Sequence, residues 1–168
     1  MADLPYRVLP DAPAAVASGA VLGRLVDGIG FRYHWATEGL EDGDLAFRPA
    51  SDSMSLGELL VHIHALLRWV AGAAGVPTAP FTQRLAGMAI RENTLRLAEV
   101  LSARFKAMPD AELARCLIRP SRGEALPFWN MVNGPLADSL THIGQVNGWR
   151  RMAGKPVPKA DVFRGRPP

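Results

Sequence analysis

An aspartate and a histidine stand four residues apart near the C-terminal end of the sequence. Asp138 and His142 belong to residues 135–145, a stretch expected to be helical. Side chains four residues apart project from one face of a helix, one turn above the other. The pair can therefore offer a carboxylate and an imidazole to one metal ion, or it can be an ordinary solvated pair on a helix surface.

A second imidazole comes from another predicted helix, which begins at Ser55 and carries His62. Two histidines and one carboxylate from two helices can hold a divalent ion and leave coordination positions open for water and substrate. His62, Asp138 and His142 are therefore candidate ligands of a metal ion, and the solvated pair remains the alternative at this point. If an ion is bound, zinc or nickel is the first candidate, and iron or manganese is an alternative.

Two other polar residues on the predicted helices, His34 and Glu58, are further candidates for the site. His34 shares a flanking stripe with Asp27 and Glu38, so it either reaches the site or is a hydrogen-bonded structural residue. Glu58 lies one turn before His62, but Ser55 and Glu58 also have the spacing of a capping box. Glu58 is therefore either part of the cap or an acid/base or supporting residue of the site.

The helix after Ser55 carries a second histidine two residues beyond His62. His64 must point in a different direction from His62, because residues two apart do not share a helix face. Glu58, His62, Leu66 and Trp69 form one stripe along the helix. We therefore expect His62, and not His64, to face the interior of the protein.

Apolar residues at three- and four-residue intervals predict four long helices. Their expected ranges are 13–40, 55–74, 82–108 with Thr82 as the cap, and 127–154. Residues 109–112 are expected to open a short turn or a single helical turn, and residues 117–126 to form a polar connection, either irregular or a short hairpin. Pro135 lacks the N–H that a continuous helix needs, so the fourth helix should kink at Asn133–Gly134. The pattern predicts an all-α protein, a four-helix bundle with a kinked fourth helix.

The chain has 168 residues, enough for one domain that buries roughly 70% of the surface of its unfolded form. We divide it into an extended segment 1–12, a helical bundle 13–154 and a basic, proline-rich tail 155–168. Cys116 is the sole cysteine, which excludes an internal disulfide and favours a reducing compartment. No early run has the pattern of a signal peptide, and no apolar run has the length expected of a membrane span. We expect a cytoplasmic, soluble protein.

The formal charge of +3 and the isoelectric point near 9.5 raise the question of nucleic-acid binding. The excess positive charge lies mostly in the last 19 residues, from Arg150 onward. No run of lysine and arginine alternates with aromatic residues, and no DNA- or RNA-reading motif is present. We therefore expect neither nucleic acid nor a membrane as a partner.

Several motifs of this sequence resemble those of the DinB-like superfamily, the damage-inducible proteins and their thiol-dependent S-transferase relatives. The resemblance depends on SLGELLVH at residues 55–62 and on HIGQ at 142–145, followed by Arg150-Arg151 and by GKP at 154–156. The loop at Pro77 and the FWN sequence at 128–130 also fit. The resemblance covers nearly everything from Pro13 to Pro158.

The resemblance implies a bundle in which three side chains hold one metal ion, at the positions of His62, Asp138 and His142. The middle ligand is usually a histidine in the family, so Asp138 is a departure that would change the metal preference and lower the charge of the site. The resemblance also implies a small-molecule substrate and a homodimer.

The activity implied is a metal-dependent transfer or isomerisation that uses a low-molecular-weight thiol. Glu58 and Gln145 are then the candidate catalytic residues, for proton handling or orientation. Three tryptophans either wall an apolar pocket or belong to the core: Trp69, Trp129 and Trp149. A metal-dependent hydrolase and a non-catalytic stress-response or small-molecule-binding bundle are the alternatives.

Overall fold

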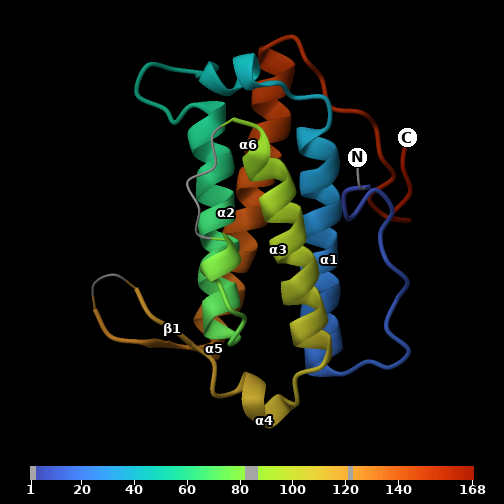
Figure 1. Ribbon diagram of the computed structural model, residues 1–168, viewed down its shortest axis with the longest axis vertical. Helices are drawn as coiled ribbons and strands as arrows, with labels where there is room; N and C mark the ends of the chain where they lie inside the picture. Colours follow the sequence, from blue (N-terminus) through green and yellow to red (C-terminus); the bar gives the residue numbers. More distant parts are fainter. Residues whose placement is uncertain (1–2, 82–86, 121–122) are drawn as a thin grey trace.

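The computed structural model describes residues 3–81, 87–120 and 123–168, and this part of the chain is mostly helical (Figure 1). Its long helices are α1 (Ser18–Thr37), α2 (Leu56–Ala73), α3 (Ala89–Lys106) and α6 (Ala137–Met152). They lie side by side, and each packs against two others, in the cyclic order α1, α3, α2, α6. The predicted all-α class is confirmed, while the DinB-like type of bundle stays a prediction. No helix in the described ranges combines the length and apolar character needed to cross a membrane.

Helix α1 begins at Ser18, so the predicted start at Pro13 is wrong. The chain before Ser18 is instead held along α1 by side chains of that helix. Arg24 donates to the carbonyl of Pro10, Trp35 donates to the carbonyl of Arg7, and Tyr6 donates to Asp27. These bonds hold residues 6–10 against α1 as a non-helical strap. Such long-range bonds cannot be inferred from a proline that resembles a local helix start. The predicted apolar face is buried: Leu22, Val26, Ile29, Tyr33, Ala36 and Leu40.

Helices α1 and α3 approach each other closely because two glycines of α1 face α3. A Cβ atom at Gly19 would lie 2.3 Å from the carbonyl oxygen of Phe105, and one at Gly23 would lie 2.9 Å from that of Ser102. No side chain fits in that space without moving the backbone of α3. The contact between these two helices is the most extensive in the protein.

A single 3-10 turn, η1 (Asp42–Ala46), connects α1 to the start of α2. The predicted capping box is present: Ser55 Oγ accepts from the N–H of Glu58, and the Glu58 carboxylate accepts from the N–H of Ser55. Helix α2 ends at Ala73, and Gly75 follows with a φ of +75°. This left-handed residue is the usual helix stop.

The third helix begins later than predicted in the described part of the chain. Helix α3 starts at Ala89, and the N–H of its N-cap residue Met88 donates to the carboxylate of Asp42. The predicted cap Thr82 lies outside the described residues. After α3 come a short helix, α4 (Asp110–Leu113), and an antiparallel hairpin of β1 (Leu117–Ile118) and β2 (Leu126–Pro127). Of the alternatives given for these two segments, the structure has the helical turn and the hairpin.

The kink predicted in the fourth helix is also confirmed. Helix α5 (Phe128–Met131) leads into a kinked turn, η3 (Val132–Leu136), and then into α6. Gly134 leaves the helical region at φ −91° and ψ −110°, just before Pro135. Ser139 Oγ donates to the carbonyl of Pro135 over 2.7 Å, so the side chain satisfies a carbonyl at the kink.

The C-terminal tail folds back onto the helices. The carbonyl of Gly165 accepts from the N–H of Leu9 over 2.9 Å, which joins the tail to the N-terminal segment. The buried Arg150 donates to the carbonyls of Ala36 and Glu38, so the end of α6 is fixed to the end of α1. Lys155 pairs with Asp44 at 2.6 Å, and part of the basic charge of the tail is therefore neutralised.

Candidate metal centre

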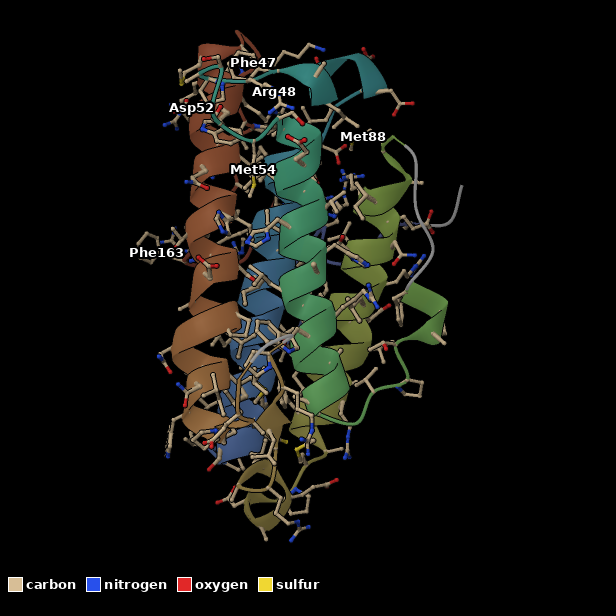
Figure 2. The ribbon with its side chains drawn as sticks, turned by 90° about the vertical axis from the view of Figure 1, so that its left-hand side faces the viewer. Phe47, Arg48, Asp52, Met54, Met88 and Phe163 are labelled. Atoms are coloured by element: carbon tan, nitrogen blue, oxygen red, sulfur yellow. The ribbon has the colours of Figure 1, made fainter. Side chains whose placement is uncertain are left out.

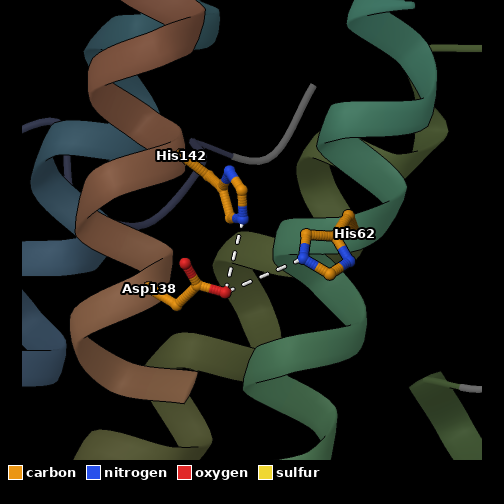
Figure 3. Close-up of side chains that lie close together, drawn as sticks. All are labelled: His62, Asp138 and His142. Carbon is orange, nitrogen blue, oxygen red and sulfur yellow. Dashed lines mark ion pairs between the residues drawn. The ribbon is translucent and has the colours of Figure 1, made fainter. Parts of the chain in front are cut away.

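The three predicted ligands lie together between α2 and α6 (Figure 3). Asp138 Oδ2 lies 3.4 Å from Nε2 of His142 and 3.9 Å from Nε2 of His62. The imidazoles of His62 and His142 meet edge to face, with ring centroids 4.7 Å apart. One ligand atom from each residue lies within 4.8 Å of the other two. Helix α6 thus provides the pair at i and i+4, and α2 provides the third donor.

The three ligand atoms lie within 4.8 Å of one another, and the two distances from Asp138 can be compared with what a metal ion requires. Ligands about 2.05 Å from a tetrahedral ion are about 3.3 Å apart, so the His142–Asp138 distance already fits. The His62–Asp138 distance would have to shorten by about 0.6 Å, which a rotation of the exposed Asp138 side chain can supply. Two imidazole nitrogens and one carboxylate oxygen are suitable donors for zinc and other first-row divalent ions.

The group is open to solvent on one side. The side chains of His62, Asp138 and His142 are 36%, 46% and 17% exposed, so water and a small ligand can reach the space between them. A hollow of about 510 Å³ adjoins His62. Its lining is more apolar than polar, and it includes four polar side chains besides His62: Arg48, Asp52, Ser53 and Glu58. Figure 2 shows the loop with Arg48, Asp52 and Met54 beside the start of α2.

Gln145 determines which ring nitrogen of His142 carries the proton. Its Oε1 lies 2.6 Å from Nδ1 of His142, one turn along α6. An amide oxygen can only accept, so Nδ1 carries the proton and donates it. In the neutral ring the lone pair is then on Nε2, which faces the Asp138 carboxylate at 3.4 Å. A lone pair and a carboxylate repel each other unless a proton or a metal ion lies between them, and the arrangement therefore favours a cation at this point.

Glu58 stays in its capping box and does not join the three ligands. Its carboxylate accepts from the N–H of Ser55 and pairs with Arg48 at 3.0 Å. The bond from the Ser55 backbone, followed by that from Arg48, lowers the pKa of Glu58 below its usual value. The carboxylate is therefore ionised at neutral pH. Glu58 borders the hollow beside His62, and the cap accounts for its contacts.

His34 does not reach the predicted ligands, so the ligand alternative for this residue is wrong. Its Nδ1 lies 2.8 Å from the carbonyl of Pro5, and its Nε2 lies 3.6 Å from the carboxylate of Glu38. Burial lowers the pKa of the ring, which is therefore neutral at pH 7. Of the two alternatives given for His34, the structure therefore favours the hydrogen-bonded structural residue.

The expectation that His62 faces the interior instead of His64 is wrong. His64 is 6% exposed, with Nε2 at 2.9 Å from the carbonyl of Phe81 and Nδ1 at 3.0 Å from Thr94 Oγ1. His62 lies on the half-exposed side of α2 that faces α6. Helix α2 packs against α3 as well as against α6, so two of its sides are buried. His64 lies on the side that faces α3, where it contacts Thr94.

The three tryptophans do not form a common wall. Trp129 is 73% exposed and stacks edge to face on Phe128, whereas Trp149 is half-buried against the core. Trp69 is 37% exposed, and its indole N–H donates to the carbonyl of Arg119. Arg48, which was not predicted from the sequence, pairs with Glu58 beside the hollow. Arg48 comes from a loop, where no regular spacing signals it.

Comparison of the chain with models of known protein families, with characterised proteins and with solved structures gave no match. The case for a metal centre depends on the donors of the three side chains, on their spacing and on their access to solvent. The DinB-like resemblance stays a prediction from the motifs around His62 and His142.

Proposed function

We propose that this protein binds a divalent metal ion through His62, Asp138 and His142, and uses it in a DinB-like bundle to transfer a low-molecular-weight thiol. The observation that carries the proposal is the convergence of three ligand atoms, from two helices, within 4.8 Å. The opening of this group to solvent and the hollow that borders His62 support access by a small molecule.

Each residue has a separate task in the proposed reaction. His62 and His142 offer neutral imidazole nitrogens, and Asp138 offers one negative charge. Gln145 holds the Nδ1 proton of His142, so that Nε2 is directed at the ion. A divalent ion in this position would lower the pKa of a thiol and favour the thiolate, which is the reactive form. Gln145 is thus proposed as a positioning residue, and no proton transfer is assigned to Glu58.

The donor set also bears on the identity of the ion. Two nitrogens and one carboxylate oxygen suit zinc and nickel, and they also suit iron and manganese. Asp138 in place of a third imidazole lowers the net charge of the loaded centre by one. Compared with three histidines, this set should be less selective for zinc over manganese, because carboxylate oxygen is the preferred ligand of the harder ion.

Two other functions use the same residues. In a metal-dependent hydrolase, water would take the position proposed for the thiol. A non-catalytic bundle would keep the ion, or a small molecule, without turnover. A homodimer is part of the proposal only through the resemblance, and analytical ultracentrifugation of the full chain tests it.

Metal content is the first test. We expect about one equivalent of a divalent metal in protein purified without a polyhistidine tag and reconstituted with zinc, and loss of that metal in His142→Ala. Asp110→Asn, which removes a carboxylate at the distant start of α4, should keep it. No metal in the reconstituted wild type, or equal metal in His142→Ala, would refute the centre. If metal is bound, transfer of a thiol to an electrophile by the loaded protein, but not by His142→Ala, separates an enzyme from a binding protein.

A further inference from the structure

A second hollow lies at the other end of α2, beside the β1 strand. Its volume is about 600 Å³, and Trp69 and Leu117 form apolar parts of its wall. Three arginines also line it: Arg68 from α2, and Arg115 and Arg119 from the segment around β1. We call this site the arginine hollow. Figure 1 shows β1 near the C-terminal end of α2, and the two elements are in contact.

The positive charge of the arginine hollow is not neutralised by the protein. No carboxylate lines it. In the described ranges, none of the guanidinium groups of Arg68, Arg115 and Arg119 forms an ion pair, whereas Arg91 and Arg104 both pair with glutamates. Like charges that share a concave, partly desolvated surface repel one another, and an anion removes this cost.

Arg68 contributes to the hollow from a partly buried position on α2. Its Nε atom is buried, and no hydrogen-bond acceptor for it is found among the described residues. Guanidinium groups bind phosphate and carboxylate oxygens through paired, charge-assisted hydrogen bonds, which suits a ligand with several negative oxygens.

Trp69 adds a flat apolar surface to this site and fixes its shape. The indole N–H donates to the carbonyl of Arg119 over 3.0 Å, so the ring holds the β1 segment against α2. The ring is 37% exposed, and it therefore remains available for contact with a ligand. A hollow of this size falls within the range of about 300–1,000 Å³ that is typical of small-molecule sites.

We propose that the arginine hollow binds a small phosphate monoester that carries a flat, apolar group. The arginines bind the phosphate oxygens, and Trp69 packs against the apolar group. A small molecule fits better than a nucleic acid, because the charge is confined to one concave site and does not form a track. The site is separate from the metal centre, since only Ala65 borders both hollows. Binding is therefore expected in the presence and absence of zinc.

Isothermal titration calorimetry with phenyl phosphate tests the proposal on the full chain. We expect saturable binding to the wild type, and about tenfold weaker binding to Arg68→Gln and to Arg115→Gln. Arg151→Gln is the matched control, because it removes the same charge from an exposed position at the end of α6. It should bind like the wild type. Circular dichroism on each variant checks that the fold is retained.

Two further titrations separate the parts of the proposal. Trp69→Ala should weaken the binding of phenyl phosphate and leave the weaker binding of inorganic phosphate unchanged. A general loss of structure would weaken both. The proposal is overturned if the wild type does not bind phenyl phosphate, or if Arg151→Gln weakens binding as much as Arg68→Gln. Equal affinity for phenyl phosphate and inorganic phosphate would overturn the role of Trp69, and tighter binding of a single-stranded oligonucleotide would identify a nucleic-acid surface instead.

Discussion

Replacement of Gln145 by leucine tests the argument that this residue positions His142. The substitution keeps a side chain of similar length but removes the oxygen that lies 2.6 Å from Nδ1 of His142. The ring then loses the partner that fixes its proton on Nδ1, and Nε2 is no longer held as the free donor. Loss of such a supporting hydrogen bond typically lowers metal affinity about 10- to 100-fold, which is about 1.4–2.7 kcal/mol.

The effect should appear in metal binding and not in the stability of the metal-free protein. Gln145 is exposed, so Gln145→Leu should change the free energy of unfolding without metal by less than about 0.5 kcal/mol. At a free zinc concentration 100 times the dissociation constant, the wild type gains about 2.7 kcal/mol. A variant that binds 100-fold more weakly gains only about 0.4 kcal/mol at that concentration.

Competition with a chromophoric zinc chelator measures the affinities, and urea unfolding with and without zinc measures the gains in stability. Gln145→Glu is the conservative control, because it keeps an acceptor oxygen at the same distance and should bind zinc at least as tightly as the wild type. The reasoning fails if the wild type binds one equivalent of zinc and Gln145→Leu binds it within twofold of that affinity. It also fails if Gln145→Glu is as weak as Gln145→Leu.

Two further predictions concern stability. Asp27→Ala removes a carboxylate that is 1% exposed and accepts hydrogen bonds from Tyr6 and Lys106. It should lower the free energy of unfolding by about 3 kcal/mol and the melting temperature by about 6–12 °C, whereas Asp11→Ala, at an exposed position, should change neither. Equal melting temperatures of Asp27→Ala and the wild type in calorimetry would contradict this prediction. Burial lowers the pKa of His64, so the unfolded chain binds a proton that the folded chain does not, and stability should fall as the pH drops through about 6.5. His64→Gln should show a smaller fall between pH 7.5 and 5.5 in urea unfolding, and an unchanged slope would show that His64 is not the cause.

Features set by neighbouring residues were predictable from the sequence. The capping box at Ser55 and Glu58 needs only two side chains and their own backbone, and the kink before Pro135 follows from a missing N–H. The pairing of Asp138 with His142 was predictable for the same reason, since the geometry of one helix fixes it. His62 was assigned to the same group through the motif resemblance, and the structure brings it to the other two residues.

Features that depend on the packing of distant segments were not predictable. The start of α1 is set by bonds from α1 to a strap that precedes it, so Pro13 gave a misleading signal. The positions of His62 and His64 depend on which sides of α2 face α3 and α6. Periodicity shows that a helix has a buried face, but it does not show how many neighbours surround the helix. The arginine hollow combines residues about 50 positions apart, and none of its arginines belongs to a recognisable motif.

The kink at Val132–Leu136 has a consequence for how this site tolerates change in evolution. Gly134 leaves the helical region inside this segment, so the segment sets the direction in which α6 continues from α5. It thereby positions the first turns of α6, which carry Asp138 and His142. Gain or loss of one residue within 132–136 would disrupt the site while leaving every ligand in the sequence. An inventory of the three ligand residues is thus an incomplete signature of this site, and the length of the segment before them belongs to it.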